Sequence, residues 1–238
     1  MAKIPPRPLT GWRLWSVRLA LATLSPLLFF AVIEGALRLC GSGYPTAFFV
    51  QNADGPGFVT NRSFGRQFSP AGLDAQPWPA LLAAPKPAGT LRIFVLGESA
   101  AMGTPDPSFG FARLLEILLR QQFPARKFEV VNAAMRGINS HVILPIARDC
   151  AAHQPDLFLL YMDHNEAVGL YAPEPGAVNV AQHLGLVRTI QTVQRTRLAQ
   201  AIRAGLVRVG KKPPEETQDM AFYRRKRLAA DDPRRAPV

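Results

Sequence analysis

The sequence has few of the residues that build disulfide frameworks, metal sites and phosphate-binding loops. Only two cysteines occur among its 238 residues, Cys40 and Cys150. Two distant cysteines do not make a disulfide framework, and no Cys-x-x-Cys or Cys/His spacing indicates zinc. The sequences Gly-x-x-x-x-Gly-Lys and Gly-x-Gly-x-x-Gly are absent too, so no phosphate loop or dinucleotide site of those kinds is predicted. We therefore expect neither a metal nor a cofactor.

Acidic residues are also scarce: 17 aspartates and glutamates stand against 28 lysines and arginines, for a formal net charge of +11. A basic chain can bind nucleic acid, but this one has no recognised nucleic-acid module and no aromatic residues interleaved with a basic patch. We expect no nucleic-acid partner and interpret the basic stretch 224–235 as a solvated face. The length and the 48% hydrophobic content allow one globular domain with a core and appended segments.

The N-terminal part lacks charge over one long stretch, since residues 19–33 contain no Asp, Glu, Lys or Arg. With its apolar flanks this segment extends over 14–37, which is long enough to supply the roughly 20 residues that a membrane-spanning helix needs. Trp12 and Trp15 stand where an interfacial aromatic belt would lie, and the positive-inside rule puts the N-terminus in the cytoplasm. The sequence thus predicts a cytoplasmic N-terminus and an uncleaved transmembrane anchor in 1–40. The cations that precede the uncharged stretch are Lys3, Arg7, Arg13 and Arg18.

Three alternatives compete with an uncleaved anchor. A cleaved signal peptide needs an Ala-x-Ala-like site, and none is evident after the apolar run. A lipoprotein would be modified at Cys40, but the arginine Arg38 and the absence of a small residue just before Cys40 argue against it. A buried core helix would not explain the four cations and two tryptophans. We rank the anchor first, the signal peptide second and the core helix third.

The segment 41–90 lacks regular periodicity and is rich in Gly, Pro, Ala and aromatic residues. We interpret it as a linker and a preface to the domain, which could also pack across the domain. Next comes a domain segment, 91–176, and then 177–238, an amphipathic and basic helical region. Within the latter, 177–209 is interpreted as one long amphipathic helix.

Strand-like and helix-like stretches alternate within the domain segment. Short apolar runs at 91–96 and 156–161 predict buried strands, and 127–132, "KFEVVN", is interpreted as a further strand. Stretches 108–123 and 140–154 have the spacing of helices. This alternation predicts an α/β fold, with a parallel sheet whose two faces are covered by helices.

Polar residues follow each of these three strands. The first strand ends in Gly97-Glu98-Ser99, the second in "NAAMRGINS" (132–140) and the third in "MDHNE" (162–166). Because the carboxyl ends of parallel strands meet at one edge of the sheet, we expect these groups to gather there, where such folds bind ligands. The alternative to a functional site is an α/β sheet whose glycines merely make turns.

These three blocks resemble the SGNH (GDSL-type) hydrolase superfamily over about residues 91–166. Gly97-Glu98-Ser99 takes the place of the family's Gly-Asp-Ser, and "VVNAAMRG" places Gly137 at the second block. The third block, usually Gly-x-Asn-Asp, is here 163–166, with Asp163 in place of the glycine. The N-terminal anchor and "GESAAMG" are similar to a bacterial membrane-anchored subgroup.

The resemblance implies a three-layer, flavodoxin-like α/β domain with Ser99 as the nucleophile. The Ser99 N–H, the Gly137 N–H and the Asn165 amide would form the oxyanion hole, with Gly97 and Glu98 as supporting residues. Each preorganised donor can contribute about 3–4 kcal/mol to stabilising a tetrahedral oxyanion. The substrate would be an acyl ester or an acylated glycan. The location would be a bacterial inner membrane, with one span and an extracytoplasmic domain.

The chain lacks the residues that supply the catalytic base in this family. A serine hydroxyl is a weak nucleophile without an adjacent base, and the family's Asp-x-x-His is absent. "DMAF" (219–222) has Phe where His belongs, and His164, beside Asp163, is not part of a dyad. We therefore expect little activity and interpret the chain as an incomplete N-terminal fragment of a longer hydrolase. The alternative is a non-catalytic envelope binding or assembly module. Hydrolysis versus acyl transfer and the oligomeric state stay open. The histidines are His141, His153, His164 and His183.

Overall fold

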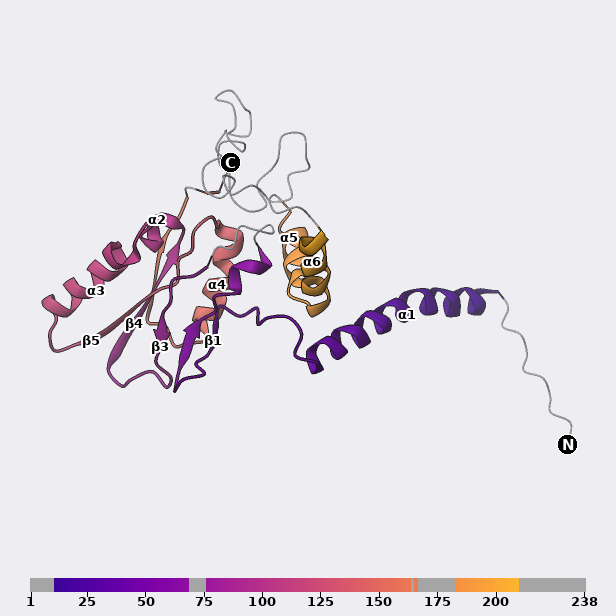
Figure 1. Cartoon of the computed structure of the whole chain (residues 1–238), viewed down its shortest axis with the longest axis horizontal. Helices are drawn as coiled ribbons and strands as arrows, with labels where there is room; N and C mark the ends of the chain where they lie inside the picture. Colours follow the sequence, from indigo (N-terminus) through magenta and orange to yellow (C-terminus); the bar gives the residue numbers. More distant parts are fainter. Residues whose placement is uncertain (1–10, 69–75, 164, 167–182, 210–238) are drawn as a thin grey trace, which may run out of the picture.

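The structure is a computed structural model that describes residues 11–68, 76–163, 165–166 and 183–209. The N-terminal helix α1, Trp12–Leu39, extends away from the domain (Figure 1). None of its residues is buried, and at about 1.5 Å per residue it is long enough for a hydrocarbon core of about 30 Å. By length and composition α1 could cross a membrane, a test that a signal sequence would also pass.

The segment predicted as a linker and preface contains a small antiparallel sheet. Its strands are β1 (Phe49–Gln51), β2 (Phe58–Thr60) and β3 (Leu81–Leu82), in the order β1-β2-β3, and the 3-10 helix η1 (Phe64–Gln67) follows β2. Phe48, Phe49 and Phe64 belong to the main hydrophobic core. The preface therefore packs against the domain, and its strands are too short to show a period in the sequence.

A parallel sheet forms the centre of the domain, as predicted. Its strands are β4 (Thr90–Gly97), β5 (Lys127–Asn132) and β6 (Leu157–Tyr161), in the order β5-β4-β6. The α/β class is thus confirmed. Residues 92–97 of the central strand β4 are buried, whereas Leu157 and Leu160 of β6 are more than half exposed.

Alternate side chains of β4 enter two separate hydrophobic clusters. Phe94 and Leu96 pack in the larger cluster with residues of α4, whereas Val95 packs with Ala101 and Ala112. Because side chains alternate across a strand, the two clusters lie on opposite faces of β4. The helices of the domain are α2 (Ser99–Met102), η2 (Pro107–Phe109), α3 (Phe111–Gln122) and α4 (Ser140–Ala151).

The prediction of one long helix over 177–209 is wrong for the described part. The chain forms two helices, α5 (Leu184–Gln194) and α6 (Arg197–Val209), that lie together (Figure 1). Thr196 begins α6, because its Oγ1 accepts a hydrogen bond from the Ala199 N–H at 3.1 Å. Threonine is a favoured helix N-cap, which explains why the helix restarts at this point. Residues 177–182 lie outside the described residues.

Candidate functional site

The strand β4 ends at a position that only glycine fits. Gly97 has φ +155°, a backbone conformation that residues with a side chain rarely adopt. A Cβ at Gly97 would collide with the carbonyl oxygen of Tyr161 on β6 and with the Cβ of Ala101 on α2. The glycine therefore allows the turn into α2 to pass close to the neighbouring strand.

Ser99 is the first residue of α2 and is partly exposed at the carboxyl end of β4. Its carbonyl oxygen accepts hydrogen bonds from the N–H groups of Gly103 and Thr104, both at 3.1 Å. Gly103 closes the short helix in a left-handed conformation, with φ +88°. Among the described residues, neither the Ser99 N–H nor its Oγ has a hydrogen-bond partner.

Glu98 joins the segment after β4 to the segment after β6. Its side chain is fully buried, and its Oε2 accepts a hydrogen bond from the Asn165 N–H at 3.0 Å. Its Oε1 lies 3.4 Å from the Asp163 N–H. The carboxylate thus acts as a bridge between two of the three polar blocks.

Asn165 and Glu166 join the third block to the second. The Asn165 side chain is 7% exposed, and its Nδ2 donates a hydrogen bond to the Ile138 carbonyl at 2.9 Å. Glu166 accepts hydrogen bonds from both the N–H and the Oγ of Ser140 at 2.7 Å. Gly137 directly precedes Ile138 and has φ +68°, and its N–H has no acceptor among the described residues. The structure therefore brings the three predicted blocks together.

Asp163 has an unusual backbone conformation for a residue with a side chain, with φ +147°. This is the position where the SGNH pattern has glycine. Its side chain is exposed and adds a negative charge at the edge that carries the candidate oxyanion donors. Holding an aspartate in such a region costs on the order of 1–3 kcal/mol.

Among the described residues, no hydrogen bond joins a histidine to Ser99. His141 is the second residue of α4, and His183 is the exposed N-cap of α5. His153 contacts the rings of Phe49 and Phe58, with centroid separations of 5.1 and 4.5 Å. Burial lowers the pKa of His153; Asp149 raises it and Arg92 lowers it further. His164 lies outside the described residues.

The opposite end of the sheet carries a buried arginine that sequence reasoning missed. Arg92 on β4 is 2% exposed, and its Nε donates to Glu129 at 2.6 Å. Its two terminal nitrogens donate to the carbonyls of His153 and Ala83, each at 2.7 Å. Gly97 is five positions after Arg92 along the strand, a distance of about 16 Å. Arg92 and its partners, and His153 with them, therefore lie at the end of the sheet away from Ser99, where we assign them a structural role.

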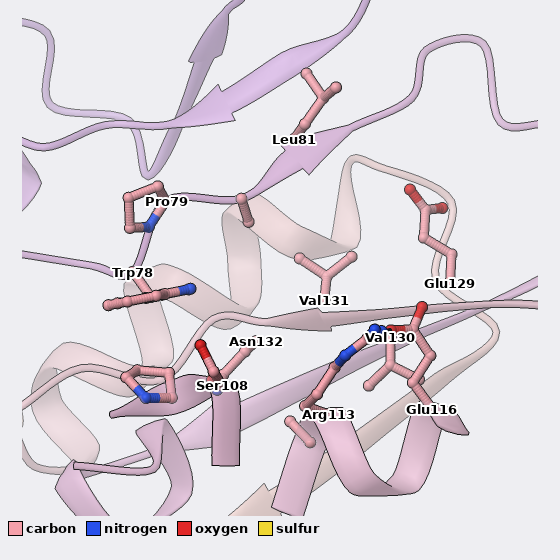
Figure 2. A pocket seen from close by; sticks show the side chains of 13 residues that line it. Trp78, Pro79, Leu81, Ser108, Arg113, Glu116, Glu129, Val130, Val131 and Asn132 are labelled. Atoms are coloured by element: carbon pink, nitrogen blue, oxygen red, sulfur yellow. Dashed lines mark hydrogen bonds and ion pairs between the residues drawn. The ribbon is translucent and has the colours of Figure 1, made fainter. Parts of the chain in front are cut away.

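A cavity of about 380 Å³ lies between the segment leading into β3, the helix α3 and the strand β5 (Figure 2). Trp78 and Pro79 form one side, and Arg113 and Glu116, which are paired at 2.7 Å, come from α3. Asn132 lies at the cavity and donates to the Met102 carbonyl at 3.0 Å, so the cavity adjoins α2. The sequence showed Trp78 only as an aromatic residue of the preface.

No group of three or more potential metal ligands occurs in the described part of the chain. Comparison of the chain with models of known protein families, with curated proteins and with solved structures finds no match.

Proposed function

We propose that the chain is a membrane-anchored serine hydrolase of SGNH (GDSL) type, of the esterase or acyl-transfer class. In this proposal α1 crosses the membrane once, and a three-layer α/β domain lies on the far side of it from the N-terminus. One observation carries the proposal. The hydrogen bonds of Glu98, Asn165 and Glu166 bring the three blocks of the SGNH pattern to one edge of the sheet.

The chemistry would take place at Ser99. Once its hydroxyl proton passed to water or hydroxide, the Oγ would bond to an acyl carbonyl carbon, and the C=O π electrons would move to the oxygen to give an oxyanion on a tetrahedral carbon. Collapse of this intermediate would break the bond to the alcohol, which would leave with a proton and leave the acyl group on Ser99. The Ser99 and Gly137 N–H groups have no acceptors among the described residues, and the Asn165 amide keeps one of its two hydrogens. These donors could stabilise the oxyanion. Without an adjacent base the attack is slow, since the serine stays protonated near neutral pH.

A non-catalytic binding module is the second candidate. Two observations favour it: no described histidine is hydrogen-bonded to Ser99, and the strained Asp163 adds a charge that an oxyanion would repel. Such a module would use the same edge of the sheet to bind an acylated ligand without forming a covalent bond.

Labelling by a fluorophosphonate separates the two candidates. The full chain in mild detergent is treated with the probe at about pH 7 and about pH 9, because hydroxide can replace a missing base. We expect slow labelling of Ser99 that rises with pH and is lost in Ser99→Ala. The matched control Ser108→Ala removes another exposed serine nearby and should leave labelling unchanged. Absence of Ser99 labelling at both pH values would support the binding module.

The charge at Asp163 provides a second arm of this experiment. Replacing it in Asp163→Gly removes the carboxylate and restores the residue that its φ favours. If Ser99 labelling proceeds through an oxyanion, Asp163→Gly should label faster than the parent chain. An unchanged or lower rate would place the carboxylate away from the developing charge.

A further inference from the structure

The outer end of α1 is hydrogen-bonded to the beginning of α6. Glu34 accepts hydrogen bonds from the N–H groups of Arg197 at 3.0 Å and Leu198 at 2.9 Å. Thr196 Oγ1 accepts the Ala199 N–H in the same turn. The first N–H groups of a helix have no acceptor inside that helix, so the Glu34 carboxylate satisfies them and holds the start of α6 against α1.

The chain that leaves α1 is attached to α6 as well. The buried side chain of Gln200 accepts a hydrogen bond from the Tyr44 N–H at 2.8 Å, and its Nε2 donates to the Tyr44 carbonyl at 3.3 Å. Figure 1 shows α6 running across the end of α1 rather than continuing along it. If α1 stands across a membrane, α6 therefore lies along the surface of that membrane, beside the boundary at Glu34.

The exposed face of α6 is apolar. Leu198, Ile202 and Leu206 follow one another at four-residue spacing, which puts them on one face of the helix. Ile202 is 56% and Leu206 69% exposed. Both also line a shallow groove that α6 makes with Phe68. An exposed apolar row on a helix that begins at a membrane boundary is suited to insertion among lipids.

The charges around this row have one sign. Residues 184–209 contain five arginines and no aspartate or glutamate. Arg197 and Arg203 lie on α6 itself, to either side of the apolar row by helical position. Amphipathic helices of this composition bind the surface of membranes that contain anionic lipids.

We propose that α6 is an interfacial helix, with Ile202 and Leu206 inserted among the lipids and Arg197 and Arg203 at anionic headgroups. The proposal rests on the proposed membrane anchor, but not on catalysis by Ser99. If the proposal holds, α6 fixes how the domain is oriented relative to the membrane. The helix α5, which packs on α6, donates from Gln191 to the His141 carbonyl at the start of α4, beside the candidate site. Lipid contact by α6 would thus set how the Ser99 edge faces the membrane.

Depth measurements with a fluorescent probe test this proposal. The full chain, in a Cys40→Ser background, carries Leu206→Cys labelled with the polarity-sensitive dye NBD; Cys150 is fully buried and is left in place. The matched control is Ala204→Cys, which is also exposed but lies on the opposite side of the helix. Both proteins are reconstituted into phosphatidylcholine vesicles with a phosphatidylglycerol fraction, with and without bromine on the acyl chains.

We expect the brominated lipid to quench the probe at 206 roughly threefold more than the probe at 204, since an interfacial helix buries its apolar face about 5–10 Å deep. The difference should shrink in vesicles of phosphatidylcholine alone. Equal quenching at the two positions would overturn the proposal. So would a blue-shifted but unquenched probe at 206, which would show that another segment of the chain or a second copy covers the groove.

A third labelled variant, Leu27→Cys in the middle of α1, separates the two membrane proposals. Quenching at 27 with none at 206 leaves the anchor standing and refutes the interfacial helix. Absence of quenching at 27 refutes the anchor and the interfacial helix together. The Ser99 labelling experiment is unaffected by either outcome, because it is done in detergent.

Discussion

The close approach at Gly97 leads to a sharp prediction about the stability of the domain. Gly97 and Gly89 stand at the two ends of β4, and both have positive φ, +155° and +72°. A Cβ at Gly97 would collide with the Tyr161 carbonyl, whereas no heavy atom lies within 4 Å of a Cβ at Gly89. The pair Gly97→Ala and Gly89→Ala therefore separates a steric collision from backbone strain alone.

The expected magnitudes differ enough to measure. Gly89→Ala should lower the free energy of unfolding by about 1–2 kcal/mol, the cost of a left-handed conformation for a residue with a Cβ. Gly97→Ala adds a collision with backbone that pairs with β4, and overpacking of this kind costs about 1–3 kcal/mol more, or higher where nothing can move. We expect a total loss of about 2–5 kcal/mol for Gly97→Ala.

Urea unfolding of the full chain in mild detergent provides the measurement. Trp78 reports on the domain once Trp12 and Trp15 of α1 are replaced by phenylalanine, and midpoints convert to free energies by linear extrapolation. A Gly97→Ala chain that does not fold, beside a folded Gly89→Ala chain, agrees with the prediction. Equal losses of unfolding free energy in the two variants would refute the prediction, because a Cβ at position 97 would then not collide with the Tyr161 carbonyl of β6.

Two further predictions concern the structural end of the sheet. Arg92→Met should cost about 3–5 kcal/mol, because it leaves Glu129 without its buried partner. Arg113→Met removes a half-exposed arginine and should change the free energy of unfolding by no more than about 0.5 kcal/mol in the same urea assay. Similar losses in the two variants would contradict the prediction that the ion pair of the buried Arg92 stabilises the domain. The lowered pKa of His153 means that the unfolded chain takes up its proton first as pH falls. Stability should therefore drop below about pH 6.5, and His153→Gln should reduce that slope; an unchanged slope would assign the pH dependence to other groups.

Local patterns in the sequence were sufficient for the central sheet and for the candidate site. Two strands of that sheet, β4 and β6, contain short apolar runs, and β5 matches its prediction, 127–132, residue for residue. The carboxyl ends of parallel strands meet at one edge, so Ser99, Gly137 and Asn165 could be assigned to one site before the structure was known. Their roles in catalysis remain a proposal.

Contacts between distant residues decided the rest. The strands β1 to β3 have two or three residues each and form only because their partners lie elsewhere in the chain. Thr196 divides the predicted long helix, and Glu34, which is 163 positions before Arg197, completes the cap of α6. Neither the burial of Arg92 nor the cavity beside Trp78 leaves a periodic signal. The sequence by itself determined the elements that a repeating apolar pattern encodes, whereas only the tertiary structure decided the features that depend on hydrogen bonds between distant segments.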